Sequence, residues 1–319
     1  MTAAPCEVLT LGETMVALRG GGPLKLGGSL EVSVAGAESN VAIGLARLGH
    51  TVRWAGAVGD DEAGELVLRT LRAEGVDLGA VTRDAQAPTG LVLFEPRLPE
   101  VTRVHYYRAD SAGSRLTPEA VEPAFAPPPR VLHLTGITPA LGPSAARACR
   151  HALRLARDHG TEVCLDVNHR SRLWSRAEAS AELRAWLPYV DVLIASDDEL
   201  PLCLPEGTPA DASAPRHLLD LGVREVVVKL GAAGARAHTA QGEVHRPARE
   251  VRAVDAVGAG DAFVAGYLSA LLDGADVTAR LDRAVTTGAF AVASRGDWEG
   301  APTRSELHLP EAPHGTVVR

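Results

Sequence analysis

The feature that most constrains the fold is a regular alternation of short apolar runs with longer amphipathic stretches. The apolar runs are rich in β-branched residues and predict strands at Val8–Leu11, Val52–Val58, Val131–Thr135, Glu162–Val167, Val190–Ala195 and Glu225–Leu230. Because these runs are continuously apolar, both of their faces are expected to be covered. The alternation therefore predicts an α/β fold, with a doubly wound, mostly parallel sheet flanked by helices.

The stretches between the strands have helical periodicity. Ala63–Glu74 places Val67 and Leu71 on one side, and Pro143–His159 has an apolar stripe opposite several arginines. Ala262–Leu272 is the longest apolar stretch and is too short to span a bilayer.

Two segments, about 14–34 and 90–110, depart from this alternation. Thr14–Val34 predicts a hairpin, and Gly90–Tyr107 predicts two more short strands, with no helical stretch to cover either segment. Either the two form a small β-sheet lid over one edge of the main sheet, or they are ordinary surface hairpins. In both cases residues 1–319 are predicted to form one domain.

The composition excludes several classes of protein. Hydrophobic residues make up 46% and charged residues 23%, which argues against a disordered, collagen-like or coiled-coil chain. The net charge of −8 disfavours nucleic acid as a partner. The N-terminus has no basic start followed by an apolar stretch, so we expect a cytoplasmic protein without a membrane partner. Four widely separated cysteines indicate neither a metal site nor a disulfide scaffold: Cys6, Cys149, Cys164 and Cys203.

The strongest local motif is a glycine-rich turn within Val254–Phe263 that runs directly into an apolar helix. Its glycines expose backbone N–H groups, and the start of a helix carries a partial positive charge, so this turn favours an anion such as phosphate. Asp261 follows on the first helical turn, where the helix dipole is expected to keep it ionised. It could accept a proton from a hydroxyl that attacks phosphorus, or it could simply cap the helix.

Polar residues also follow a predicted buried strand, in the segment Leu165–Arg170. Strand ends in α/β sheets face the ligand crevice. There Asn168 could bridge phosphate oxygens, and Arg170 could hold a carboxylate or a phosphate through two hydrogen bonds. The alternative is a solvated loop.

Two weaker signals complete the set. Lys229 ends a predicted buried strand and is followed by a glycine turn, which fits the edge of a nucleotide site but is common elsewhere. Tyr106, Tyr107 and Arg108 lie in the predicted lid, where two hydroxyls and a guanidinium suit a polyhydroxylated acid. The alternative is an aromatic pair on a sheet edge.

Together these residues resemble the ribokinase-like (PfkB) family of sugar kinases over nearly the whole chain. Ala35–Asn40 is similar to the N-terminal signature of the family, and Asp255–Asp261 is similar to its C-terminal signature. Within the family the likeness is closest to the 2-keto-3-deoxygluconate kinases. The residues that carry it are Tyr106–Arg108, Ser111–Ser114, His133–Thr138, Asp166–Arg170 with Leu173 and Trp174, and Arg295–Asp297.

The resemblance implies a role for each matching residue. Asp261 would be the catalytic base, and Glu199 would support Mg²⁺ indirectly, through water. The cofactors would be ATP and Mg²⁺, with a monovalent cation possible. The substrate, a small sugar acid, would be held by Gly36, Tyr106, Tyr107, Arg108, Arg170, Asp261 and Asp297. ATP would be held by Asn168, Arg170, Ser196, Lys229, Gly231, Gly234, Gly258, Ala259 and Gly260.

The sequence departs from the family pattern at two positions. Ser196 replaces the asparagine of the NxxE motif that ends at Glu199. Val92 stands near the position of a tyrosine in the 2-keto-3-deoxygluconate kinases, which predicts that the galacto epimer is also accepted.

The sequence thus predicts ATP-dependent phosphorylation of 2-keto-3-deoxygluconate to its 6-phosphate. One alternative is a PfkB kinase for a neutral sugar such as fructose or ribose, which would need no arginine pair. Another is a sugar or nucleotide sensor without catalysis, which would not need Asp261. A dinucleotide-dependent oxidoreductase is disfavoured, because Gly12–Met15 after the first strand is not GxGxxG. Exposed lid strands also predict a homo-oligomer formed through the lid.

Overall fold

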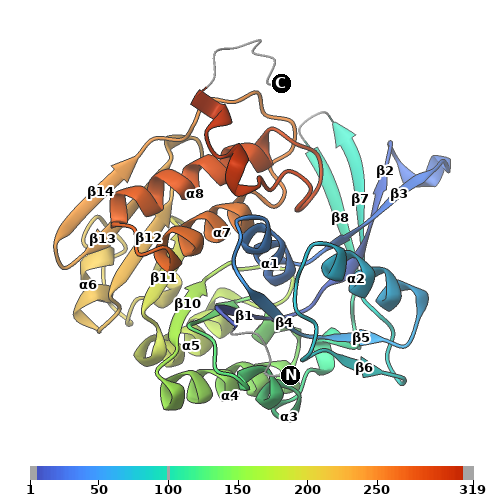
Figure 1. The fold of residues 1–319 in the computed structure, drawn as a ribbon, viewed down its shortest axis with the longest axis horizontal. Coiled ribbons are helices and arrows are strands. Elements are labelled where there is room, and N and C mark those ends of the chain that lie inside the picture. Colours follow the sequence, from blue (N-terminus) through green and yellow to red (C-terminus); the bar gives the residue numbers. More distant parts are fainter. Residues whose placement is uncertain (1–5, 99–100, 312–319) are drawn as a thin grey trace.

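The computed structural model describes residues 6–98 and 101–311 and contains a large sheet covered by helices on both faces (Figure 1). The strand order of this eight-stranded sheet is β14-β13-β12-β11-β10-β9-β1-β4. Pairing is parallel from β4 to β12, whereas β13 pairs antiparallel with β12 and β14 pairs antiparallel with β13. The strands are β1 (Val8–Leu11), β4 (Val52–Ala55), β9 (Val131–Thr135), β10 (Glu162–Asp166), β11 (Val192–Ser196), β12 (Glu225–Lys229), β13 (Ala235–Thr239) and β14 (Gly242–Arg246).

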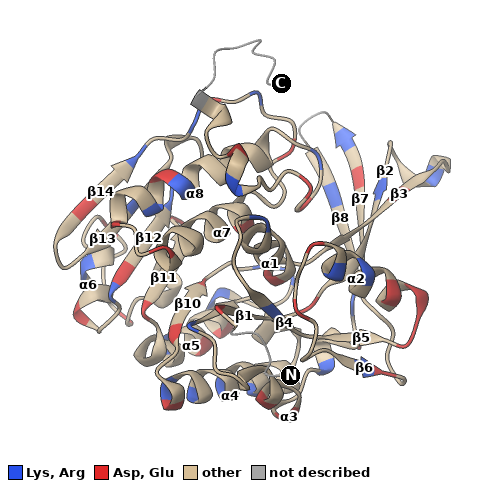
Figure 2. Ribbon diagram, viewed as in Figure 1, with Lys and Arg blue, Asp and Glu red and all other residues tan. Residues whose placement is uncertain are grey.

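The helices form two layers because alternate residues of each strand face opposite sides. Leu9 and Leu132 pack on the side of α3 to α6, whereas Val8 and Val131 pack on the side of α1, α2, α7 and α8. The charged residues of α4 lie on the side turned away from the sheet (Figure 2). The helices are α1 (Ala37–Arg47), α2 (Glu62–Ala73), α3 (Pro118–Val121), α4 (Pro143–His159), α5 (Arg176–Trp186), α6 (Ala214–Asp220), α7 (Ala259–Leu272) and α8 (Val277–Val292).

A separate four-stranded sheet stands beside the main one in the order β3-β2-β7-β8 (Figure 1). Its strands are β2 (Met15–Gly20), β3 (Leu30–Ala35), β7 (Leu91–Leu98) and β8 (Val101–Tyr107). This sheet is called the lid below. The predicted hairpin and the two further strands are therefore confirmed. The expectation that no helix covers either segment is wrong, because Val16 and Val34 join a core cluster with Val67 and Leu68 of α2.

The sequence missed one break and one reversal. The predicted strand Val52–Val58 is interrupted at Gly56, where a side chain would collide with Trp54. The chain leaves the main sheet there and forms β5 (Ala57–Gly59), which pairs with β6 (Thr82–Asp84) in a two-stranded sheet. The glycine turn after Lys229 reverses the chain into β13 and β14. The sequence did not predict these two strands, because their polar, half-exposed residues do not form the continuous apolar run of a buried strand.

The topology places the polar strand ends together. Because β1, β9, β10, β11 and β12 are parallel, their carboxyl ends meet at one edge of the sheet, and the lid begins directly after β1. Within residues 6–98 and 101–311, every helix is too short or too polar to cross a membrane.

Candidate active site

A cavity of about 750 Å³ opens between the lid and the carboxyl ends of the parallel strands. It is lined by the end of β1, the start of α1, the lid, the loops after β9 and β10, the ends of β11 and β12, the glycine turn before α7 and the loop after α8. The cavity is thus formed by residues far apart in the sequence, and its lining includes most of the polar residues that the sequence analysis singled out.

The glycine turn adopts a backbone that only glycine can provide at Gly258. This residue has φ 74°, and a Cβ there would collide with the carbonyl group of Asp297. Helix α7 starts at the next residue, so its first N–H groups lie beside the cavity. A Cβ on Gly260 would meet only Lys229 Nζ, at 3.7 Å. The turn therefore has the geometry that favours an anion at a helix start, with open space at Gly260.

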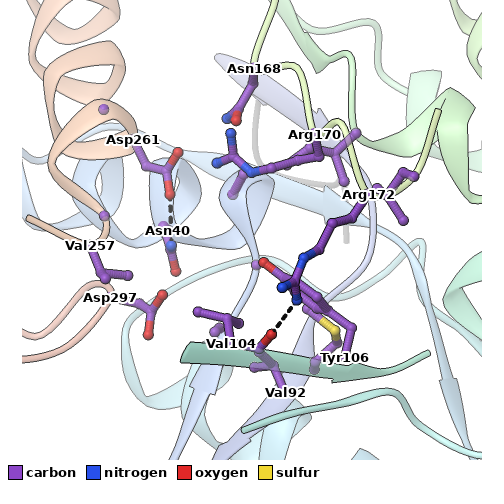
Figure 3. Close-up of a pocket in the computed structure, with 18 of the residues that line it drawn as sticks. Asn40, Val92, Val104, Tyr106, Asn168, Arg170, Arg172, Val257, Asp261 and Asp297 are labelled. Carbon is purple, nitrogen blue, oxygen red and sulfur yellow. Dashed lines mark hydrogen bonds between the residues drawn. The ribbon is translucent and has the colours of Figure 1, made fainter. Parts of the chain in front are cut away.

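Asp261 is a buried carboxyl group at this helix start. Its pKa is raised to about 7, with burial as the largest cause and Asp166 acting in the same direction, while the Asn40 hydrogen bond and the positive charges of Arg170 and Lys229 lower it. Asn40 Nδ2 donates to Asp261 Oδ2 at 2.8 Å (Figure 3). Contrary to the prediction from the sequence, the helix start therefore does not keep this carboxyl group fully ionised at neutral pH, because burial raises its pKa. The carboxyl group is poised to exchange a proton near neutral pH.

Lys229 and Asp166 form an ion pair beneath the cavity. Lys229 Nζ lies 2.8 Å from Asp166 Oδ1, and Asn168 Nδ2 donates to the other oxygen of Asp166 at 3.3 Å. Burial opposes the charge of Lys229, but the nearby carboxylates outweigh burial and raise its pKa. Asn168 has φ 39°, an uncommon backbone conformation for a residue other than glycine. The ion pair therefore fixes a cation and an amide at the edge of the cavity.

Glu199 joins two strand-end loops. Its Oε1 accepts a hydrogen bond from the backbone N–H of His169 at 2.8 Å, and its Oε2 accepts one from that of Ser196 at 3.0 Å. Both oxygens are therefore engaged by the protein itself. The residues that the structure describes contain no group of three or more His, Cys, Asp or Glu side chains that could hold a metal ion.

The lid side of the cavity contains a second buried ion pair. Glu13 accepts hydrogen bonds from Arg108 Nε, at 2.7 Å, and from Ser111 Oγ. Glu13 is almost fully buried, so Arg108 compensates a charge that would otherwise be costly. Arg108 lines the cavity, but its positive charge is already offset by Glu13.

Two arginines after β10 lack such a partner. Among the described residues, neither Arg170 nor Arg172 forms an ion pair with a carboxylate, and both are exposed in the lining of the cavity. Figure 3 shows the Arg170 guanidinium beside Asn168 and the Arg172 side chain crossing to the lid, where it donates to the Val104 carbonyl at 2.6 Å. These two residues give this wall of the cavity its positive charge.

The two lid tyrosines point in opposite directions. Neighbouring residues of a strand face opposite sides of a sheet, and Tyr106 pairs with Val92 on the cavity side whereas Tyr107 pairs with Leu91 on the other. Tyr107 is 64% exposed and does not line the cavity. The sequence analysis assigned both tyrosines to the substrate, and the pleat of β8 separates them.

Most of the other candidate residues come together. Those that line the cavity are Gly36, Tyr106, Arg108, Asn168, Arg170, Ser196, Glu199, Lys229, Gly258, Gly260, Asp261 and Asp297. Gly231, Gly234 and Ala259 do not line it. Gly234 instead serves the reversal into β13, since it has φ 93° and a Cβ there would collide with the Arg246 carbonyl.

Sequence reasoning missed several lining residues, among them Glu13, Asn40, Phe94 and Arg172. Asn40 carried a usable signal, because it is one of only two asparagines in the chain and the other is Asn168. Glu13 and Phe94 have mainly apolar neighbours in the sequence, and no local motif there indicates that they line a cavity.

Comparisons with known proteins agree with this geometry. The pfkB family of carbohydrate kinases matches residues 7–304. A 2-dehydro-3-deoxygluconokinase of Thermoproteus tenax is 38% identical over 310 residues, which cover 95% of this chain and 93% of that protein. A 2-dehydro-3-deoxygalactonokinase of Haloferax volcanii is 34% identical over 91% of this chain and 92% of that protein.

A solved structure is also similar throughout. An Escherichia coli protein described as a ribokinase II, in complex with ATP and Mg²⁺, has a TM-score of 0.89 at 25% identity over 96% of this chain and 99% of that chain. A family match that spans nearly the whole chain, together with relatives above 30% identity, shows that the protein belongs to the PfkB family of carbohydrate kinases.

Proposed function

We propose that this kinase transfers the γ-phosphoryl group of ATP to the terminal hydroxyl of 2-keto-3-deoxygluconate, giving the 6-phosphate. The observation that carries the proposal is the position of Asp261 at an anion-binding helix start, in a cavity that also contains the unpaired Arg170 and Arg172. The names of the relatives at 38% and 34% identity support a keto-deoxy sugar acid as substrate.

Asp261 acts as the base in this reaction. It takes the proton of the terminal hydroxyl as that oxygen forms a bond to the γ-phosphorus, and the bond from phosphorus to the bridging oxygen of ATP breaks to release ADP. The backbone N–H groups of the glycine turn, residues 258–260, hold the oxygens of the transferred group, where negative charge is present throughout. Asn40 orients the Asp261 carboxylate through its 2.8 Å hydrogen bond.

The substrate carboxylate is recognised by positive charge on the wall after β10. Arg108 was expected to share this task with Arg170, but Glu13 offsets its charge, so we assign the excess charge to Arg170 and Arg172. Gly36, Tyr106 and Asp297 line the cavity where the sugar hydroxyls would lie. A kinase for a neutral sugar would not need these arginines, because its substrate has no carboxylate. A sensor without catalysis would not need a base with a raised pKa, so both alternatives are disfavoured.

ATP would approach Asn168, Ser196 and Lys229 at the strand ends, with its phosphates at the glycine turn. Mg²⁺ bound to the ATP phosphates would neutralise part of their charge. The described residues contain no group of three or more acidic, His or Cys side chains that would form a cage for the ion. Glu199 holds the two loops together through its hydrogen bonds to the backbone of His169 and Ser196.

A homo-oligomer through the lid is a further part of the proposal. The lid face opposite the cavity exposes Leu30, Val32 and Tyr107, which lie on the same side of the sheet by their register. Val32 is 55% exposed and Tyr107 is 64% exposed. An apolar sheet face of this kind is stabilised when a second copy covers it.

Asp261→Asn is expected to lower kcat by about 100-fold or more, since that is the usual scale for loss of a general base. The wild-type kcat should also fall as the pH falls through about 7, because the carboxyl group must be ionised to accept the proton and its pKa is raised to that value. A coupled assay between pH 5.5 and 9 measures both effects. Asp158→Asn on the exposed side of α4 is the control, and a mutant Asp261→Asn with most of its kcat would reduce Asp261 to a helix cap.

Gly260→Val is expected to abolish nucleotide binding while leaving the fold intact, because its side chain would enter the open space in which the phosphates are proposed to lie. The shift of the melting temperature by ATP measures this, since a ligand that binds only the folded state stabilises it. Gly258→Ala is the contrasting variant and should lower the melting temperature without ATP. Equal stabilisation of wild type and Gly260→Val by ATP would remove the turn from the nucleotide site.

A panel of acceptors decides the substrate class. We expect kcat/KM for 2-keto-3-deoxygluconate to exceed that for fructose and ribose by about 100-fold or more, because charge-assisted hydrogen bonds contribute about 1.5–3 kcal/mol each. Arg172→Leu should lower the value for the acid by about tenfold and leave the neutral sugars unchanged, and Arg154→Leu on α4 should change neither. The galacto epimer should also be accepted, since Val92 offers no hydroxyl. A neutral sugar that outperforms every keto-acid would sink the assignment.

Sedimentation velocity tests the oligomer. The molecular mass obtained from sedimentation should be at least twice the 33.3 kDa mass of one chain. Val32→Glu should shift it to the monomer, because a buried charge at the interface would be unpaired. Val251→Glu, at an exposed valine outside the lid, should not. A monomeric wild type would refute the lid contact and leave the kinase assignment intact.

A further inference from the structure

Three consecutive residues near the end of the described chain each bond to a lid strand. The Asp297 carboxylate accepts a hydrogen bond from Arg19 of β2, and the Glu299 carboxylate accepts one from Ser33 of β3. Between them, Trp298 Nε1 donates to the Val34 carbonyl of β3 at 3.1 Å. The loop that presents Asp297 to the cavity is therefore attached to the lid along its length.

The same loop is anchored to the body of the protein by Arg47 of α1. Its guanidinium lies 5.1 Å from the ring centre of Trp298 and donates to the carbonyl groups of Glu299, at 3.0 Å, and Ala301, at 2.7 Å. Arg47 is itself held by an ion pair with Glu74 at 2.8 Å. The loop thus lies between a fixed contact on α1 and its contacts on the lid.

Arg19 is the residue that joins the lid to the acidic side of the cavity. It shares the cavity face of β2 with Met15 and Ala17, and its guanidinium carbon lies 4.0 Å from the ring centre of Phe94. Besides its bond to Asp297, its Nη1 lies 3.4 Å from Asp255 Oδ2. The Asp255 Oδ1 accepts a hydrogen bond from the N–H of Val257 in the glycine turn.

We propose that Arg19 is a positioning residue that couples the lid to the acceptor site. From the lid it holds the Asp297 carboxylate ionised and aimed into the cavity, and through Asp255 it steadies the glycine turn. The proposal rests on the proposed function, in which Asp297 accepts hydrogen bonds from substrate hydroxyls. Arg19 itself does not line the cavity and does not touch the substrate.

The pH dependence follows from the groups that face Asp297. The pKa of Asp297 is raised to about 6, with burial as the largest cause; Arg19 already lowers this pKa, whereas Glu299 on the same loop and Asp255 before α7 raise it. Removal of Arg19 therefore raises the pKa further. At neutral pH more of the Asp297 carboxyl group is then protonated, and it can no longer accept hydrogen bonds with both oxygens.

The experiment compares Arg19→Met, which keeps an apolar chain against Phe94, with Arg19→Lys, which keeps the charge. For Arg19→Met we expect KM for the sugar acid to rise about tenfold or more at pH 7, and kcat and KM for ATP to change by a smaller factor, through the lost 3.4 Å contact with Asp255. The rise should diminish towards pH 9, where Asp297 ionises without help. Arg19→Lys should recover most of the affinity, and the lid variant Arg97→Met should match wild type. An unchanged KM and pH profile in Arg19→Met would overturn the proposal.

A double-mutant cycle separates positioning from a general loss of structure. Asp297→Asn removes the charge that Arg19 serves, so adding Arg19→Met to it should raise KM little further. Fully multiplicative effects would show that Arg19 does not act through Asp297. If Arg19→Met alone does not fold, two measurements still test the proposal. One is the KM of the double mutant, in which Asp297→Asn removes the carboxylate that Arg19 compensates; the other is the pH profile of Arg19→Lys.

Trp298 supplies a readout that needs no substrate. Its emission, taken as the difference from Trp298→Phe, should shift to longer wavelength in Arg19→Met, because the lid contact that shields the indole is weakened. An unchanged emission would contradict the coupling. If wild type phosphorylates no sugar acid, the proposed function fails while this comparison still tests whether Arg19 holds the loop to the lid.

Discussion

The site depends on the compensation of buried negative charge. Asp166, Glu13 and Asp297 are all buried carboxyl groups at the cavity, and each has a cation from a distant segment: Lys229, Arg108 and Arg19. Removing the cation from such a pair would be strongly destabilising, so the pairs hold the loops of the cavity in a fixed relation. Three further buried carboxyl groups of the cavity lining have no ion pair among the described residues. Asp261 accepts a hydrogen bond from the Asn40 amide, Glu38 from the hydroxyls of Thr135 and Thr138, and Glu199 from two backbone N–H groups.

The lack of a paired cation at Asp261 has a chemical consequence. A carboxyl group that lacks a paired cation keeps a raised pKa, and a base is most effective when its pKa lies near the working pH. The neighbouring charges of Arg170 and Lys229 moderate the effect of burial without cancelling it. Lys229 forms its ion pair with Asp166, at 2.8 Å, and not with Asp261. Asp166 is thereby stabilised as a carboxylate, whereas Asp261 can exchange a proton near neutral pH.

Local sequence patterns predicted the elements well but not their partners. The strand Val131–Thr135 and the helix Pro143–His159 agree with the structure because their apolar periods depend only on nearby residues. The pairing of Arg19 with Asp297 joins residues 278 positions apart, and no local pattern encodes it. Tyr107 fails for a different reason: the motif identified the right segment, but the direction of each side chain depends on the register of β8 with β7.

The arrangement of the lid explains why binding and chemistry can be linked in this fold. One face of the lid sheet lines the cavity with Val92, Phe94 and Tyr106, and the same face carries Arg19. Any displacement of these strands would therefore change the cavity and the environment of Asp297 together. Since Asp297 packs against Gly258 through its backbone, the displacement would also reach the glycine turn at which we propose that the phosphates bind. If the lid closes over the substrate, this attachment would order the proposed acceptor side and the glycine turn in the same step, which is how a lid excludes water from a transferred phosphoryl group.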